Sequence, residues 1–99
     1  MKFFGTATAL VTPFLPSGEI DFPSLGKLID LQIENGVEGI VPCGSTGEAA
    51  TQSTYEKLSV ISYTLERVAG RCKVIAGTGS NDTAASIKLT QAAKDMGAE

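Results

Sequence analysis

Apolar residues occur along this chain in two alternating patterns. Short runs rich in apolar and β-branched residues occur at 4–12, 39–43 and 73–77. Each is followed by a longer segment in which apolar residues recur every three or four positions, at 22–35, 54–69 and 83–96. Short bounded runs are typical of buried strands, and the three-to-four spacing is typical of helices with one apolar side. The pattern therefore predicts three strands, each followed by a helix.

Capping residues support the predicted helix ends. Asp21 stands before the first helix, and Ser53 with Glu56 has the S-x-x-E spacing of a capping box before the second. Either Asn81 or Asp82 can cap the third helix. A glycine follows each helix: Gly36, Gly70 and Gly97. The apolar positions expected to face inward are Leu25, Leu28, Ile29, Leu31, Ile33, Leu58, Ile61, Leu65, Val68, Ile87, Leu89, Ala92, Ala93 and Met96.

Repeated strand–helix units imply parallel strands joined by right-handed crossovers. A sheet of three parallel strands has two unpaired edges, and helices on one face leave the other face uncovered. We therefore expect residues 1–99 to form the N-terminal portion of a single domain in a longer α/β protein. A (β/α)₈ TIM barrel, of which this chain supplies the first three βα units, is favoured over an open doubly wound sheet.

Charge narrows the choice of partners. The formal net charge is −3 and no basic stripe is present, so a nucleic-acid partner is not expected. No apolar run approaches the length of a membrane span, and the first residues do not resemble a signal peptide. We therefore expect a cytoplasmic protein with no membrane association.

The chain has no histidine, and its two cysteines, Cys43 and Cys72, lack a metal-binding spacing. No metal site is expected, and Ser–His and Cys–His nucleophile pairs are excluded within this segment. Cys43 follows the second predicted strand and is interpreted as a small buried residue rather than a reactive thiol.

Two glycine-rich turns follow predicted strands. In Gly44-Ser45-Thr46-Gly47, backbone N–H groups and two hydroxyls are suited to a carboxylate, whereas the spacing and the lysine of a P-loop are missing. A turn without any ligand explains the same spacing, and both readings remain open on these grounds. The second turn begins like a dinucleotide fingerprint at Gly77, but Asp82 replaces its third glycine, which disfavours nucleotide binding.

Three ordered motifs resemble a known family. They are "TALVTPF" at 8–14, "GSTGE" at 44–48 and "VIAGTGSN" at 74–81. Together they are similar to the start of the dihydrodipicolinate synthase and N-acetylneuraminate lyase family of pyruvate-dependent aldolases. The resemblance implies a (β/α)₈ barrel in which a lysine forms a Schiff base with pyruvate. The third motif resembles the synthases, which condense pyruvate with L-aspartate semialdehyde in diaminopimelate and lysine biosynthesis; the sugar-acid aldolases and dehydratases remain an alternative.

The resemblance also implies roles for three residues. Thr46 matches the position that binds the pyruvate carboxylate through its backbone N–H and hydroxyl, and Gly47 belongs to the same substrate-binding turn. Ser45 matches the hydroxyl that links two tyrosines in a proton relay, although the synthases most often have threonine there. Its alternative role is to stabilise the turn. Glu48 is interpreted as a structural residue at the start of the second helix.

The imine-forming lysine and the relay tyrosines belong, by resemblance, to later parts of the barrel. No cofactor is implied, only the covalent lysine–pyruvate imine. The helix lysines Lys27, Lys57, Lys88 and Lys94 are interpreted as solvated, Lys2 as terminal, and Lys73 as lying at the far end of its strand. Residues 1–99 alone are therefore expected to be inactive. The full enzyme is expected to be a homo-oligomer, either a dimer or a tetramer.

The resemblance further bears on feedback inhibition by lysine. Inhibited synthases use an asparagine at the position of Asn81, a glutamate at the position of Ala85, and histidine near the start of the second helix, where Thr54 and Lys57 stand here. The ammonium group of bound lysine would have no carboxylate at Ala85 to pair with, and it would be repelled by the positive charge of Lys57. Inhibition by lysine is therefore expected to be weak or absent. From a different class, a small non-catalytic α/β module that binds anions also fits the two glycine turns.

Overall fold

The computed structural model describes residues 3–99. Its elements are β1 (Ala7–Ala9), α1 (Phe22–Glu34), β2 (Gly39–Val41), a short 3₁₀ turn (Ala49–Thr51), α2 (Thr54–Val68), β3 (Lys73–Val74) and α3 (Thr83–Met96). The helices lie within one residue of the predicted bounds. None of the helices in this part of the chain is both long enough and apolar enough to cross a membrane.

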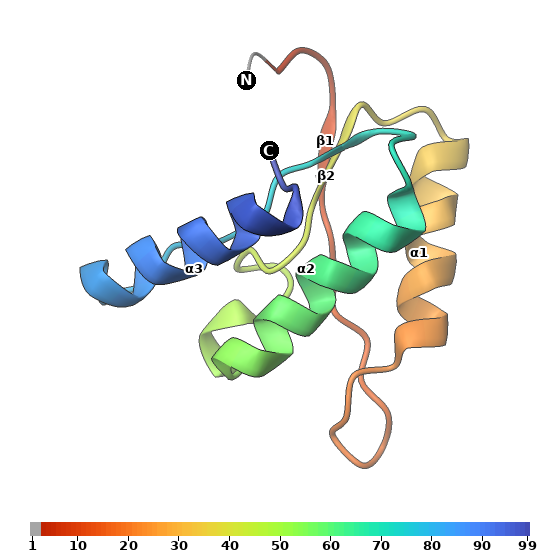
Figure 1. The fold of residues 1–99 in the computed structure, drawn as a ribbon. Helices are drawn as coiled ribbons and strands as arrows, with labels where there is room; N and C mark the ends of the chain where they lie inside the picture. The colour runs from red at the N-terminus through yellow and green to blue at the C-terminus, as the bar shows by residue number, and fades with distance from the viewer. Residues whose placement is uncertain (1–2) are drawn as a thin grey trace.

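The three strands form one parallel sheet in the order β1-β2-β3. Figure 1 shows α1, α2 and α3 side by side on the same side of this sheet. The strands are shorter than predicted because only single backbone bonds continue the pairing beyond them. These bonds join Leu10 N to Val41 O (3.0 Å), Ile75 N to Ile40 O (2.9 Å) and Gly77 N to Pro42 O (2.8 Å). The arrangement is that of consecutive βα units, with all carboxyl ends of the strands at one edge.

Side chains cap the helices as the spacing predicts. The Asp21 carboxylate accepts a hydrogen bond from Ser24 N at 3.1 Å, and Asp82, not Asn81, caps α3 by accepting from Ala85 N at 3.1 Å. At α2, Ser53 and Glu56 form both bonds of the capping box. These contacts satisfy N–H groups that the first turn of a helix leaves without a partner.

The core lies between the sheet and the helices. Its buried members include Leu10, Leu25, Ile29, Ile40, Val60, Ile61, Val68, Val74 and Ala93. Three positions predicted to face inward are instead exposed: Leu31 (50%), Ile87 (54%) and Met96 (40%). In α1 and α3 the buried stripe is narrow, and a residue two positions from a buried one, such as Leu31 after Ile29, lies on the opposite side of the helix.

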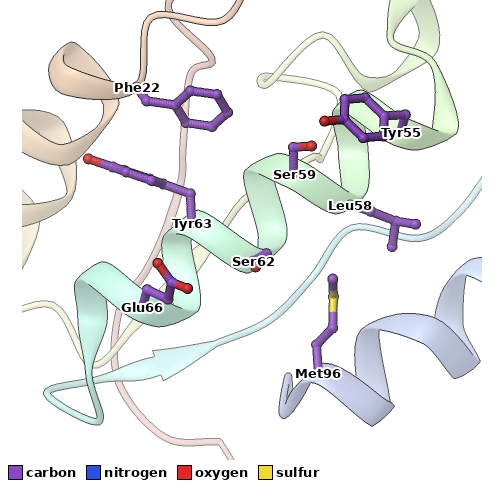
Figure 2. Close-up of a pocket in the computed structure, with 8 residues that line it drawn as sticks. All are labelled: Phe22, Tyr55, Leu58, Ser59, Ser62, Tyr63, Glu66 and Met96. Carbon is purple, nitrogen blue, oxygen red and sulfur yellow. The ribbon is translucent and has the colours of Figure 1, made fainter.

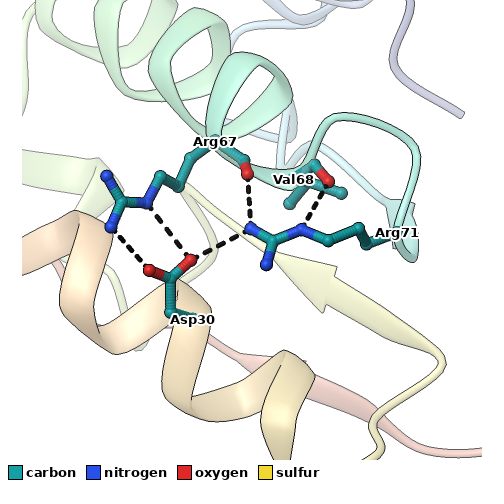
Figure 3. A network of polar contacts seen from close by, with 4 residues as sticks. All are labelled: Asp30, Arg67, Val68 and Arg71. Carbon is teal, nitrogen blue, oxygen red and sulfur yellow. Dashed lines mark hydrogen bonds and ion pairs between the residues drawn. The ribbon is translucent and has the colours of Figure 1, made fainter.

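An ion-pair network joins α1 to the C-terminal end of α2 (Figure 3). Asp30 accepts hydrogen bonds from Arg67, at 2.5 and 3.2 Å, and from Arg71, at 3.0 Å. These bonds, from Arg67 foremost, lower the pKa of Asp30 to about 2. Arg71 also donates to the carbonyls of Arg67 and Val68, at 2.6 and 3.1 Å, which satisfies the end of α2. The network holds the two helices together at the end of α2 away from the Gly44–Gly47 turn.

Candidate functional site

The Gly44–Gly47 turn lies at the carboxyl end of β2. Gly47 N donates to Gly44 O at 3.1 Å and Glu48 N donates to Ser45 O at 3.0 Å, so the turn is closed by its own backbone. The N–H groups of Ser45 and Thr46 donate no hydrogen bond to any group of residues 3–99. Both residues are exposed. The turn therefore presents two adjacent backbone donors and two hydroxyls, the groups that bind a carboxylate.

Gly47 lies beneath this turn rather than at its surface. It is buried, and its carbonyl accepts hydrogen bonds from the Thr12 hydroxyl at 2.7 Å and from Gln52 Nε2 at 2.6 Å. A Cβ at this position would lie 3.0 Å from Leu10 O and 3.1 Å from Thr12 Oγ1. Both polar groups of Gly47 are thus engaged within the protein, so it shapes the turn while Ser45 and Thr46 face outward.

Thr12 and Gln52 were not singled out by sequence reasoning. Thr12 lies within the first motif, and Gln52 follows the 3₁₀ turn, but nothing local links them, because they are 40 residues apart. They meet because β1 and β2 are paired neighbours. A polar pair buried at 4% and 8% exposure becomes visible only once the strands are aligned.

The segment that follows β3 supports the turn from its other side. Gly77 is so close to the preceding turn that a Cβ would lie 2.3 Å from Cys43 O and 2.8 Å from Gly44 N. Only a residue without a Cβ allows two backbones to approach this closely. The first glycine of the apparent dinucleotide fingerprint therefore has a packing role beside the candidate site.

Cys43 is a buried structural residue, as interpreted from its position. Its side chain is 2% exposed, and its thiol donates to the Lys57 carbonyl at 3.5 Å. Burial raises its pKa to about 11, which outweighs the opposing effect of the nearby Lys57 ammonium. The thiolate needed for nucleophilic chemistry is therefore scarce at neutral pH.

A cleft opens between the turn, the start of α2 and the loop that leads into α3. Its walls include Ser45, Glu48, Ala49, Thr54, Lys57, Asn81, Asp82 and Ala85. Two expectations need correction here. Glu48 is not at the start of the second helix: it has φ of 62° and precedes the 3₁₀ turn, six residues before α2 begins at Thr54, because the chain makes an additional turn there. Lys57 is not fully solvated, because it is half-buried in the wall of this cleft.

The other lysines of the described chain do not line the cleft beside Ser45. Lys73 forms an ion pair with Glu99 at 3.2 Å near the amino end of β3. Lys27, Lys88 and Lys94 are exposed on helices, and Lys2 lies outside the described residues. Among the described lysines, only Lys57 lines the cleft beside Ser45.

A second hollow lies on the outer side of α2 (Figure 2). It is lined by Phe22, Tyr55, Leu58, Ser59, Ser62, Tyr63, Glu66 and Met96. The rings of Phe22 and Tyr63 pack with centroids 5.0 Å apart, and Gly26 leaves room for the Tyr63 hydroxyl. Tyr55 is 81% exposed. Neither tyrosine borders the Gly44–Gly47 turn, and this hollow has no converging backbone donors.

The fold and the turn define a class of protein: consecutive βα units of a parallel sheet whose polar turns gather at the carboxyl ends of the strands. Residues 2–99 match the sequence model of the dihydrodipicolinate synthetase family. The chain belongs to this family.

Named relatives give the same result. The chain is 53% identical over 95 residues to 4-hydroxy-tetrahydrodipicolinate synthase of Pseudomonas putida, covering 96% of this chain and 32% of the relative. It matches the crystal structure of dihydrodipicolinate synthase from Bacillus anthracis with a TM-score of 0.94 and 47% identity, over 99% of this chain and 34% of that one. It also matches the synthase of Acinetobacter baumannii, solved in complex with pyruvate, with a TM-score of 0.92 and 47% identity. That match covers 95% of this chain and 32% of the other.

The chain therefore spans about a third of the length of its relatives. Its βα units match the N-terminal third of the synthase structures, which confirms the prediction of the first three units of a (β/α)₈ barrel.

Proposed function

We propose that the Ser45–Thr46 turn binds the carboxylate of pyruvate in a Schiff-base lyase. In the full-length protein, of the length that the relatives have, this lyase condenses pyruvate with L-aspartate semialdehyde to 4-hydroxy-tetrahydrodipicolinate. The observation that carries the proposal is the pair of adjacent N–H groups, at Ser45 and Thr46, that have no partner among residues 3–99. A relative that is 47% identical was solved with pyruvate, which supports this ligand.

The turn would act on one end of the substrate. Two backbone N–H groups and the Thr46 hydroxyl hold the carboxylate, so the 2-oxo carbon is presented in a constant orientation to the lysine of a later strand. That amine adds to the ketone, water leaves, and an imine forms. The Ser45 hydroxyl, which is exposed beside Thr46, transfers protons to and from the reacting groups together with the tyrosines of later loops. Gly47 keeps the turn in shape.

Further parts of the proposal concern the whole protein. We expect a homodimer or homotetramer in the cytoplasm, no cofactor beyond the lysine–pyruvate imine, and no nucleic-acid partner. A sugar-acid aldolase uses the same carboxylate turn, but the 53% identity to a synthase favours the synthase reaction. The same identity favours an enzyme over a non-catalytic anion-binding module.

Borohydride reduction tests the proposed chemistry. The full-length protein treated with pyruvate and borohydride is expected to carry one reduced pyruvyl adduct on a lysine, identified by mass spectrometry of its peptides. Residues 1–99 alone, treated identically, are expected to carry none, because the resemblance places the imine-forming lysine on a later strand of the barrel. Absence of an adduct on the full-length protein would remove the assignment.

Lysine titration tests the predicted lack of feedback inhibition. In the lining of the cleft, Ala85 offers no carboxylate and Lys57 adds a positive charge. Of the two acidic residues in this lining, Asp82 is engaged in capping α3, which leaves Glu48. The full-length enzyme is therefore expected to keep its rate at millimolar lysine, and Ala85→Glu is expected to raise its lysine affinity by about tenfold. Inhibition of the unaltered enzyme at millimolar or lower lysine would contradict this.

A further inference from the structure

The Gly47 carbonyl is the end of a chain of hydrogen bonds that leads to the candidate ligand position. It accepts from Thr12 Oγ1 at 2.7 Å and from Gln52 Nε2 at 2.6 Å, and Nε2 also lies 3.3 Å from Thr12 Oγ1. This carbonyl belongs to the peptide group whose N–H is that of Glu48. In a trans peptide the C=O and N–H point in opposite directions, so fixing one fixes the other.

The next link runs through Ser45. Glu48 N donates to Ser45 O at 3.0 Å. Ser45 O belongs in turn to the peptide group whose N–H is that of Thr46, and this N–H has no acceptor among residues 3–99. Two peptide dipoles are therefore connected in series, with their donor end at Thr46. Hydrogen bonds connected in this way polarise one another, so donors at one end strengthen the donor at the other.

Thr12 and Gln52 are polar side chains buried beneath the turn. They are 4% and 8% exposed, and Gln52 Oε1 is buried without a hydrogen-bond partner among the described residues. An unsatisfied buried acceptor lowers stability, and a leucine at this position would avoid that cost. The Gln52 amide instead directs its Nε2 group to the Gly47 carbonyl at 2.6 Å and to Thr12 Oγ1 at 3.3 Å.

We propose that Thr12 and Gln52 are positioning residues that orient and polarise the Thr46 N–H toward the carboxylate of the substrate. This inference rests on the proposed function, because it requires a carboxylate on the turn. Neither residue touches that ligand; each acts through the two peptide groups. Carboxylate binding contributes equally to the ground state and the transition state, so the effect falls on KM for pyruvate and leaves kcat nearly unchanged.

Steady-state kinetics of the full-length enzyme test the proposal. Gln52→Leu and Thr12→Val are each expected to raise KM for pyruvate by about three- to tenfold, the loss of one hydrogen bond that strengthens a bond to a charged group. Thr12→Ser keeps the hydroxyl and is expected to restore KM to within about twofold of the original value. Gln52→Leu removes the hydrogen bonds of Nε2 together with the unpaired Oε1, and because these two effects oppose each other, its melting temperature is expected to change little.

Two results would overturn the proposal. One is an unchanged KM in both Gln52→Leu and Thr12→Val; the other is a fall in kcat and melting temperature together in all three variants, which indicates packing alone. Borohydride trapping of pyruvate on the unaltered enzyme separates the two hypotheses. Trapping with an unchanged KM in the variants rejects only the positioning role, whereas no trapping on the unaltered enzyme rejects the proposed function.

Discussion

Gly77→Ala is expected to destabilise the full-length protein by about 3 kcal/mol or more and to abolish binding at the turn. The new Cβ would lie 2.3 Å from Cys43 O, 2.6 Å from Cys43 C and 2.8 Å from Gly44 N. All three are backbone atoms, so no side chain can rotate away, and either the end of β3 or the Gly44–Gly47 turn must move. Urea denaturation measures the loss of stability, and pyruvate trapping by borohydride measures the loss of the site.

Gly79→Ala is the matched control. Gly79 lies two residues further along the same loop, and a Cβ there meets nothing within 4 Å. Its φ is not in the left-handed region, so alanine is not strained. This variant is expected to stay within about 0.5 kcal/mol of the original stability. Equal stability of the two variants would show that the approach of Gly77 to Cys43 is not a constraint on the fold.

Ser45→Ala is expected to lower kcat of the full-length enzyme by about 100-fold or more, the usual contribution of one group in general acid–base catalysis. KM for pyruvate is expected to change much less, because the adjacent backbone donors on the turn remain. Ser45 makes no hydrogen bond through its hydroxyl to residues 3–99, so the alanine removes no contact of the described fold. Rates measured with pyruvate and L-aspartate semialdehyde provide the test.

Ser45→Thr is the control for the proton relay. Threonine keeps the hydroxyl, and the exposed position has room for its methyl group. It is the residue that the synthases most often have there, so kcat is expected to stay within a few-fold of the original value. If Ser45→Ala retains full kcat, the hydroxyl carries no proton, and the serine serves only the turn.

Short-range signals were sufficient for the helices. The Ser53–Glu56 capping box, the Asp21 cap and the glycine after each helix mark the ends of the helices, and each acts within four residues along the chain. Strand bounds were less predictable, since pairing depends on neighbouring strands. The run at 4–12 contains only three residues of regular strand, because beyond Ala9 a single bond from Leu10 N to Val41 O continues the pairing.

The predicted inward faces of α1 and α3 were too broad for a related reason. Periodicity identifies a side of a helix, whereas the width of the buried stripe depends on what packs against it. Leu31 and Ile87 match the apolar composition of the inner face, yet they lie opposite Ile29 and Leu89 and are exposed. Only the positions of the neighbouring elements decide such cases.

The sequence by itself was enough to indicate a parallel order of βα units, because strand–helix alternation is encoded in consecutive residues. The carboxylate-binding role of the turn at Ser45 and Thr46 came from the resemblance to a family and stays a prediction. The folded molecule decided what lies behind that turn. Thr12, Gln52 and Gly77 approach Cys43 and Gly47 from the segments after β1, before α2 and after β3, and their contacts depend on strand register and backbone distance. Residues so far apart in sequence acquire a shared geometry only when the sheet brings them together.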